Sequence, residues 1–272
     1  ARALCCEGRT STMNIRKIAQ IDPSYFEINR EERNYAAIFF AALCRPGNTE
    51  RFLRHRGIDS RVGPEFGIYF EYAYLRDLWN EITNEDTKKE IIRQHLPIQG
   101  IDEILRRPVK EINEKFGVAG KASSEFVQCP AKWSIRKYDD SFPDRNDEFL
   151  RICKFKWSFN IKPDIVIHLD KNHAVCIEAK YESGEGSYPS SGQEKRIFQR
   201  RSLDPVRQME LQKYMMEVIL GLQTQFVFLV CGKKKSNTHE VVSWAEVFHC
   251  LDMSEMPAFA MHMVKGISAS AR

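Results

Sequence analysis

The sequence predicts an α/β fold in which a mainly helical N-terminal half precedes a C-terminal half that forms a sheet. Apolar residues recur at helical spacing up to about Phe116, whereas short β-branched and aromatic runs begin near Glu125. A further amphipathic helix lies between two of these runs. Helices and strands arranged in this way are typical of a sheet covered by helices.

The N-terminal half contains the longest apolar helix of the prediction. It covers Glu31–Cys44, and nearly all of its positions after Asn34 are apolar, so we expect it to be buried on all sides. Asn29 is its expected cap, and Glu32 completes a pattern close to a capping box. Further helices are expected over Glu65–Ile82, Asp86–Leu96 and Ile101–Phe116. Pro108 should break or kink the last of these.

Strand-like composition begins after a Gly-, Ala- and Ser-rich link at Gly117–Ser124. The expected strands are Glu125–Cys129, Trp133–Tyr138, Arg151–Asn160, Ile165–Leu169, Ala174–Ala179 and Gln225–Cys231. A tight polar turn at Asp170–Asn172 joins two of them, which predicts a β-hairpin. A Gly- and Ser-rich loop follows at Ser183–Gly192. Helices are then expected over Asp204–Leu222, where Pro205 takes the first helical position, and over Ser243–Leu251.

Composition excludes several classes of protein. No apolar run approaches the roughly 20 residues needed to cross a bilayer, so we expect no membrane association. The eight cysteines are mostly dispersed and form no C-x-x-C pair. This spacing argues against a disulfide framework or a structural zinc site, and it favours a reducing, cytoplasmic compartment.

The net charge of +4 is too small to indicate a nucleic-acid partner by itself, but basic residues gather locally. One cluster consists of Lys195, Arg196, Arg200, Arg201 and Arg207. Such a cluster can neutralise phosphates, and the alternative interpretation is a solvated basic loop.

Two carboxylates and a lysine lie at one end of the predicted hairpin. Asp164 begins its first strand, and Glu178 and Lys180 lie near the end of the second. Facing positions of an antiparallel pair are neighbours, and residues two apart project from one face of a strand. Carboxylate oxygens suit Mg²⁺ or Mn²⁺, and such a metal can activate water for attack on a phosphodiester. The lysine can orient that water or stabilise developing negative charge.

The pattern Pro163-Asp164, thirteen residues, then Glu178-Ala179-Lys180 resembles the signature of the PD-(D/E)XK nuclease superfamily. The resemblance implies a restriction-endonuclease-like αβββαβ core, with a mixed sheet flanked by helices. Glu31–Cys44 would supply the first helix, and Arg151–Asn160 the first strand. It also implies a Mg²⁺-dependent hydrolase, a nuclease acting on DNA, in which Asp164 and Glu178 hold the metal and Lys180 assists the water.

The same resemblance implies supporting residues. Glu32 is the candidate for a further metal or water contact, and its alternative role is in a capping box. Gln208 follows the hairpin, where exonuclease-like members carry a Q-x-x-x-Y pattern that helps to position the site. This chain departs from that pattern, because Tyr214 lies six residues after Gln208. In view of the motif, the basic cluster becomes a candidate nucleic-acid contact, and a homodimer would suit duplex cleavage.

We therefore expect one nuclease domain over residues 13–272, with a helical insertion at about 50–120 and the catalytic core at about 150–232. Residues 1–12 show no helical or strand period, and we interpret them as a tag, leader or disordered segment. Two alternatives remain open. One is a catalytically silent nucleic-acid-binding or assembly subunit with the same fold. The other is a metal-dependent phosphohydrolase acting on nucleotides.

Overall fold

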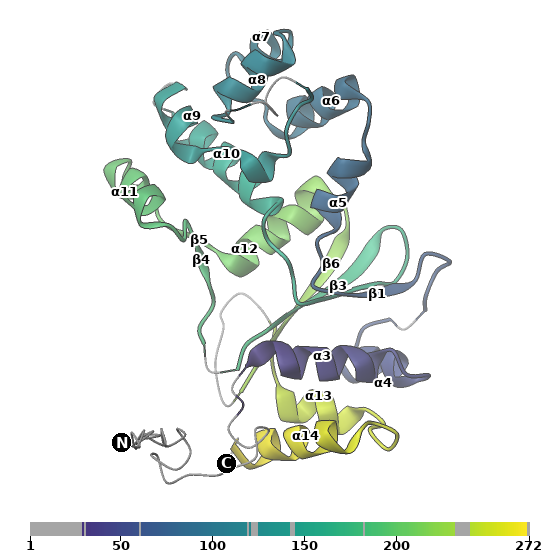
Figure 1. Cartoon of the computed structure of the whole chain (residues 1–272). Coiled ribbons are helices and arrows are strands. Elements are labelled where there is room, and N and C mark those ends of the chain that lie inside the picture. Colours follow the sequence, from purple (N-terminus) through teal and green to yellow (C-terminus); the bar gives the residue numbers. More distant parts are fainter. Residues whose placement is uncertain are drawn as a thin grey trace, which may run out of the picture.

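A five-stranded mixed sheet forms the centre of the computed structural model (Figure 1). The structure describes residues 29, 31–59, 61–118, 120, 125–141, 145–181, 183–231 and 240–270. The strands, in their order across the sheet, are β1 (Gly67–Phe70), β2 (Ile165–His168), β3 (His173–Ala179), β6 (Gln223–Val230) and β7 (Glu240–Ser243). The predicted α/β class, with a mixed sheet flanked by helices, is confirmed.

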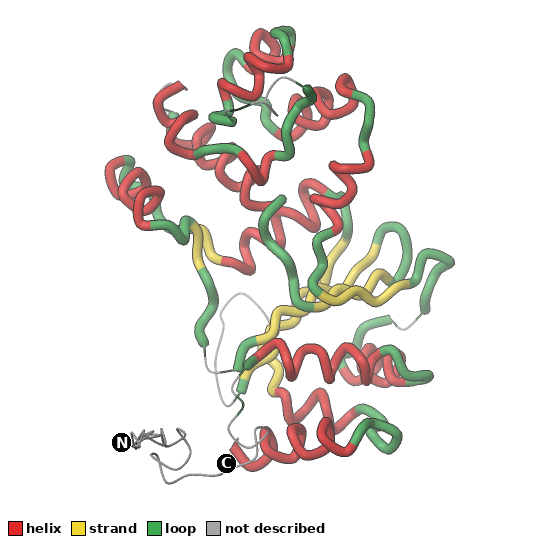
Figure 2. The backbone as a smooth tube through the Cα atoms, in the orientation of Figure 1, coloured by secondary structure: helices red, strands yellow, loops and turns green. Residues whose placement is uncertain are grey.

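Helices cover both faces of this sheet (Figures 1 and 2). The helices on one face are α3 (Glu32–Leu43), α4 (Asn48–His55), α13 (Trp244–Cys250) and α14 (Ala258–Ser270). The opposite face carries α12 (Gln208–Lys213), which continues as the π-helical segment η3 (Tyr214–Ile219). Strand alternation divides the core accordingly, because Ile165 and Ile167 of β2 face the first layer whereas Val166 faces the second.

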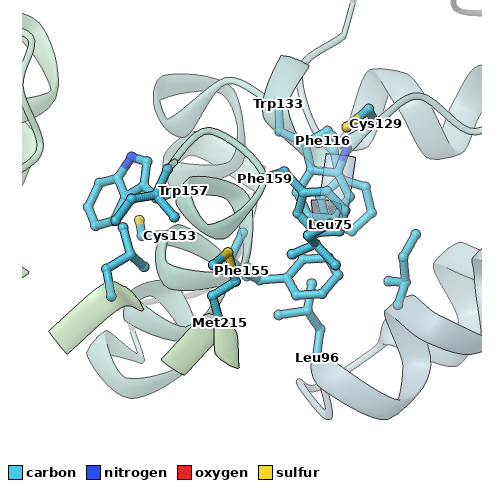
Figure 3. Packing of buried hydrophobic residues seen from close by; sticks show 14 of the residues in the cluster. Leu75, Leu96, Phe116, Cys129, Trp133, Cys153, Phe155, Trp157, Phe159 and Met215 are labelled. Carbon is cyan, nitrogen blue, oxygen red and sulfur yellow. The ribbon is translucent and has the colours of Figure 1, made fainter. Parts of the chain in front are cut away.

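A helical unit is inserted between β1 and β2, above the sheet in Figure 1. Its helices are α5 (Tyr74–Glu81), α6 (Glu85–His95), α7 (Ile101–Leu105), α8 (Val109–Lys115), the 3-10 turn η2 (Pro130–Lys132), α9 (Ile135–Ser141) and α10 (Asn146–Ser158). Large aromatic side chains fill its interior (Figure 3). Phe116 and Trp133 stack with their ring centroids 3.9 Å apart, and Trp133 also lies against Phe155.

The predicted hairpin is confirmed. β2 and β3 pair antiparallel, with Ile165 opposite Ile177 and His168 opposite Ala174. Asp170 closes the turn, because its Oδ1 accepts hydrogen bonds from the backbone amides of Asn172 and His173. β3 then pairs with β6 in parallel, and β6 with β7 in parallel.

The connection from β3 to β6 contains a short ribbon that projects from the body of the molecule (Figure 1). β4 (Ser187–Tyr188) pairs antiparallel with β5 (Val206–Arg207), and α11 (Gly192–Arg200) lies between them in the chain. α11 lies against α9 of the helical unit, and its buried Phe198 packs on Phe149 and Trp157 of α10. The ribbon leads directly into α12.

Several predicted strands are wrong. Arg151–Asn160 lies almost entirely in α10, which is buried on most sides, so an apolar run concealed its helical period. Trp133–Tyr138 leads into α9, and no strand forms at Glu125–Cys129. Burial among other helices outweighed the strand-like composition of these segments. The first strand of the sheet is instead Gly67–Phe70, inside Glu65–Ile82, which we had expected to be helical.

The starts of two helices also differ from the predicted ones. The helix expected from Asp204 begins at Gln208, because Val206 and Arg207 are held in β5. The N-cap of α3 is Glu31, with no side-chain cap, so the expected capping box is absent, and Asn29 instead accepts a hydrogen bond from the amide of Glu31. Ala37 and Ala41 expose one stripe of α3, so this helix is not buried on all sides. The elements that were not predicted are α4, β4, α11, β5, β7 and α14.

The helices expected over Asp86–Leu96 and Ser243–Leu251 form as α6 and α13, and Pro108 separates α7 from α8 as expected. Asn84 caps α6, and Ser243 caps α13 through a capping box with Glu246. Residues 1–12 and most of Gly117–Ser124 lie outside the described residues. No disulfide joins cysteines within the described ranges, and no helix there has the length and apolar composition of a membrane span.

Candidate active site

The hairpin brings Asp164 and Glu178 to the same end of the sheet. Continuing the β2–β3 register by one residue places them opposite each other. The position of Asp164 is fixed because its Oδ2 accepts a hydrogen bond of 2.7 Å from the backbone amide of Ala179. Glu178 is only 1% exposed, because β6 lies on its other side. Its carboxylate is therefore held almost without contact with water.

Lys180 lies two residues after Glu178 and turns back towards it. Its Nζ lies 2.6 Å from Oε1 of Glu178, and the lysine is 8% exposed. The backbone of Lys180 is held on both sides, because its amide donates to Leu229 and its carbonyl accepts from Nε1 of Trp244. The lysine is thus positioned by the sheet and by α13.

Two glutamines of α12 hold the carboxylate of Glu178. Nε2 of Gln208 donates to Oε1 over 2.5 Å, and Nε2 of Gln212 donates to Oε2 over 2.6 Å. They lie four residues apart, which places both on one face of the helix. Gly186 permits this approach, because a Cβ at that position would lie 2.7 Å from Oε1 of Gln208. The two glutamines therefore hold both oxygens of the Glu178 carboxyl group in one orientation.

Glu32 reaches the site from the first turn of α3. Its Oε1 lies 3.3 Å from Nζ of Lys180, and its Oε2 accepts hydrogen bonds from Oγ of Ser183 and, over 3.4 Å, from the amide of Tyr181. Glu32 therefore contacts the lysine of the site and the backbone that follows β3. The structure brings together all of the predicted residues Asp164, Glu178, Lys180, Glu32 and Gln208.

These residues line a polar cavity of about 320 Å³. Its wall includes further side chains that the sequence did not single out: Arg33, Glu71, Asn160, Ile161, Lys162 and Tyr188. Glu71 has a φ of 52°, in the left-handed region that non-glycine residues rarely adopt. Its amide donates to the carbonyl of Asp164, which holds it against the motif. Glu71 was missed because its segment was expected to be helical, and Tyr188 because it lies in a segment expected to be a loop.

Burial and mutual repulsion change the ionisation of the site. Desolvation and the nearby Asp164 together raise the pKa of Glu178 to about 7, against the lowering effect of Lys180. Desolvation likewise raises the pKa of Asp164 to about 6, opposed by the Ala179 amide. The pKa of Lys180 is raised overall, because attraction to Glu178 outweighs its own desolvation. Lys180 is therefore a cation. Its single positive charge does not offset the desolvation and mutual repulsion of the two carboxylates, so their pKa values stay raised.

The side chains present fit a divalent ion. Asp164 and Glu178 offer oxygen atoms, and Oδ1 of Asp164 makes no hydrogen bond to any described residue. Within the described ranges, no group of three His, Cys, Asp or Glu side chains is arranged to hold a metal. Mg²⁺ commonly binds through one or two carboxylates and takes its other ligands from water and phosphate, so two carboxylates suffice.

The predicted basic cluster divides into two parts. Arg201 is only 10% exposed; its Nε lies 2.5 Å from Oδ1 of Asp139, and its guanidinium lies over the ring of Phe149. Arg200 also pairs with Asp139, although it is exposed. The remaining members, Lys195, Arg196 and Arg207, are exposed along α11 and the β4–β5 ribbon. These exposed residues remain candidates for nucleic-acid contact, whereas Arg201 anchors α11 to the helical unit.

Comparisons with family models, with curated proteins and with solved structures give no match to this chain. The assignment of a function therefore depends on the side chains of the cavity and on their chemistry.

Proposed function

We propose that this chain is a metal-dependent nuclease that hydrolyses phosphodiester bonds of DNA. The observation that carries the proposal is the meeting of Asp164, Glu178 and Lys180 in one polar cavity, where glutamines hold the central carboxylate. The succession α3, β1, β2, β3, α12, β6 also supports a restriction-endonuclease-like αβββαβ core. In this arrangement β1, and not Arg151–Asn160, would be the first core strand.

Asp164 and Glu178 would hold Mg²⁺ or Mn²⁺. When bound, the ion would polarise the phosphodiester and lower the pKa of a water molecule. The raised pKa values of both carboxyls support this role, because a divalent cation would supply the positive charge that Lys180 alone does not.

The other side chains have separate tasks. Lys180 remains protonated and presents its ammonium beside Glu178, where it can stabilise negative charge that develops on the phosphate. Gln208 and Gln212 keep the carboxylate of Glu178 in one orientation. Glu32 restrains Lys180 through a second ion pair. These contacts position the site before substrate arrives, which is how phosphoryl transfer gains most of its rate.

Exposed cations near the cavity favour a polymer over a nucleotide. Arg33 and Lys162 line the cavity and are exposed, Arg207 lies on the projecting ribbon, and Lys195 and Arg196 lie on α11, which the ribbon carries. A mononucleotide carries too few phosphates to use cations spread over such a length. A polynucleotide can contact the site and the ribbon at the same time.

Cleavage assays test the proposal directly. Purified chain would be incubated with supercoiled plasmid, linear duplex and single-stranded DNA, in Mg²⁺, Mn²⁺ or EDTA. We expect metal-dependent products that disappear in Asp164→Asn and Lys180→Ala. Glu81→Gln, a change of an exposed glutamate on α5, is the matched control and should cut like the unmodified chain. A chain that retards DNA on a gel but does not cut it under any metal condition would instead be the silent binding subunit.

A further inference from the structure

A cluster of aromatic rings lies beside the candidate active site, on the same face of the sheet. Its members are Tyr69 of β1, Tyr72, Tyr74 at the start of α5, and His168 of β2. Tyr72 is buried at the centre, with its ring centroid 5.8 Å from that of Tyr69 and 5.6 Å from that of Tyr74. Tyr69 and Tyr74 are 45% and 46% exposed. Two partly exposed tyrosine rings therefore pack on one buried ring that supports both of them.

The positions of these rings are set by the fold. Oη of Tyr72 lies 2.7 Å from Nε2 of His168, which fixes the central ring. Tyr69 packs edge-on against His168, with centroids 5.3 Å apart. Gly67 leaves room for Tyr69, because a Cβ on Gly67 would lie 2.6 Å from the Tyr69 hydroxyl. These restraints keep the exposed rings in place, so little conformational entropy would be lost when a partner stacks on them.

The ring cluster is continuous with the candidate active site. Tyr69 pairs with Val166, two residues after Asp164, and alternation places their side chains on one face of the sheet. At roughly 3.3 Å per residue, Val166 and its partner Tyr69 lie only about 7 Å along the strand from Asp164. Glu71 lines the site cavity, and the next residue, Tyr72, donates its amide to the carbonyl of Pro163. A ligand that runs along β1 from the cavity would therefore reach the rings.

We infer that Tyr69 and Tyr74 form a stacking surface for unpaired nucleobases, so that the chain acts on single-stranded nucleic acid or on a single-stranded region of a duplex. The inference rests on the proposed nuclease function for its choice of partner. A tyrosine ring offers a flat face for a base and a hydroxyl that can bond to its polar edge. Bases inside a duplex are stacked on each other and cannot offer their faces to these rings.

The surroundings of the rings suit this ligand. Leu78 lies one turn after Tyr74 on α5 and is also exposed, so the apolar surface extends beyond the ring. The exposed Lys162 precedes Pro163 and lines the cavity, where it can contact the backbone phosphates of a strand whose bases lie on the tyrosines. DNA and RNA share the stacking chemistry, so both strands belong in the test.

Binding measured without cleavage tests the inference. Fluorescence anisotropy in EDTA would compare the unmodified chain, Tyr69→Leu/Tyr74→Leu and Tyr69→Phe/Tyr74→Phe. The probes are a labelled single-stranded DNA, the same length as RNA, the matching duplex, and an abasic strand. Leucine removes the aromatic face, whereas phenylalanine keeps it. Circular dichroism and thermal melting would establish that every variant is folded.

We expect the leucine pair to bind single strands more weakly by about tenfold for each ring removed, and the phenylalanine pair to bind much more nearly as the unmodified chain does. Duplex affinity should change little, and the abasic strand should bind the unmodified and leucine chains equally. Equal single-strand affinity in all three chains would overturn the inference. So would an equal loss for single strand and duplex, or an unmodified chain that binds no single strand.

A parallel cleavage assay in Mg²⁺ separates the two proposals. A chain that binds single strands through its tyrosines but never cuts them would contradict the nuclease proposal and leave the stacking surface standing. If the unmodified chain cuts DNA while the leucine pair binds single strands as tightly as it does, the nuclease proposal survives and the stacking surface does not.

Discussion

Without divalent cations, the folded chain should become less stable as the pH rises through neutrality. The pKa of Glu178 is raised from 4.5 to about 7, and that of Asp164 from 3.8 to about 6, chiefly by desolvation. A carboxyl with a higher pKa in the folded than in the unfolded chain binds its proton more tightly when folded. Protonation therefore stabilises the fold fully below the unfolded pKa, and this stabilisation is lost as the pH rises through the folded value.

The shift of Glu178 sets the size of the effect. Each pKa unit corresponds to about 1.36 kcal/mol. A rise from 4.5 to about 7 therefore makes the free energy of unfolding about 3 kcal/mol smaller above the folded pKa than it is below the unfolded pKa. For a chain of this size, 1 kcal/mol moves Tm by about 2–4 °C, so Tm should fall by about 6–12 °C. Asp164 contributes in the same direction at lower pH. Lys180 does not oppose the trend, because its pKa is raised above 10.5 and it stays charged throughout.

Thermal melting in EDTA from about pH 5 to about pH 8 measures this slope. Glu178→Gln cannot ionise, so its Tm should vary much less with pH, even if its amide disturbs the contacts with Gln208 and Gln212. Glu81→Gln should keep the slope of the unmodified chain. Added Mg²⁺ should raise Tm most at the alkaline end, because it binds the ionised carboxylates. The reasoning fails if Glu178→Gln and the unmodified chain lose Tm equally between these pH values.

Three further substitutions test separate contacts. Gly186→Ala places a methyl group 2.7 Å from Oε1 of Gln208, so cleavage should fall at least tenfold while circular dichroism spectra stay unchanged; full activity would show that Gln208 does not need this position. Arg201→Ala breaks the buried pair with Asp139 and should lower the free energy of unfolding by about 2–4 kcal/mol in denaturant titrations, whereas a loss under 0.5 kcal/mol would contradict the anchoring role. Lys195→Ala should leave stability unchanged but weaken DNA binding, and the dependence of the binding constant on salt concentration should fall by about the amount expected for one phosphate contact. An unchanged salt dependence would show that Lys195 does not contact DNA.

The hairpin and its charged residues could be predicted because every signal for them is local. β-branched runs, a polar turn and the spacing of Asp164, Glu178 and Lys180 all lie within one short stretch, and the register follows from the turn. Glu32 and Gln208 could be placed only through the resemblance. Their contacts join α3 and α12 to β3, and no local pattern specifies which helix face meets a strand.

The helical unit was harder to predict because its segments are buried on several sides. α10 contains aromatic and β-branched residues, which are also common in strands. When an apolar run is short, its composition does not distinguish a buried strand from a buried helix. β1 presents the opposite difficulty. It has only four residues, and its aromatic spacing continues without interruption into α5. Its pairing with β2, more than ninety residues later in the chain, decides its conformation.

The position of β1 has consequences for function. With Arg151–Asn160 as the first strand, the edge of the sheet beside Asp164 would carry no tyrosine from β1 and no Glu71. Because Gly67–Phe70 occupies that edge, the segment after it must turn sharply at Glu71, which adds a carboxylate to those of Asp164, Glu178 and Glu32 in the cavity. The same strand places Tyr69 beside His168. A short edge strand thus joins the charged cavity to the aromatic surface, and a bound strand that used both would run along β1 towards Asp164.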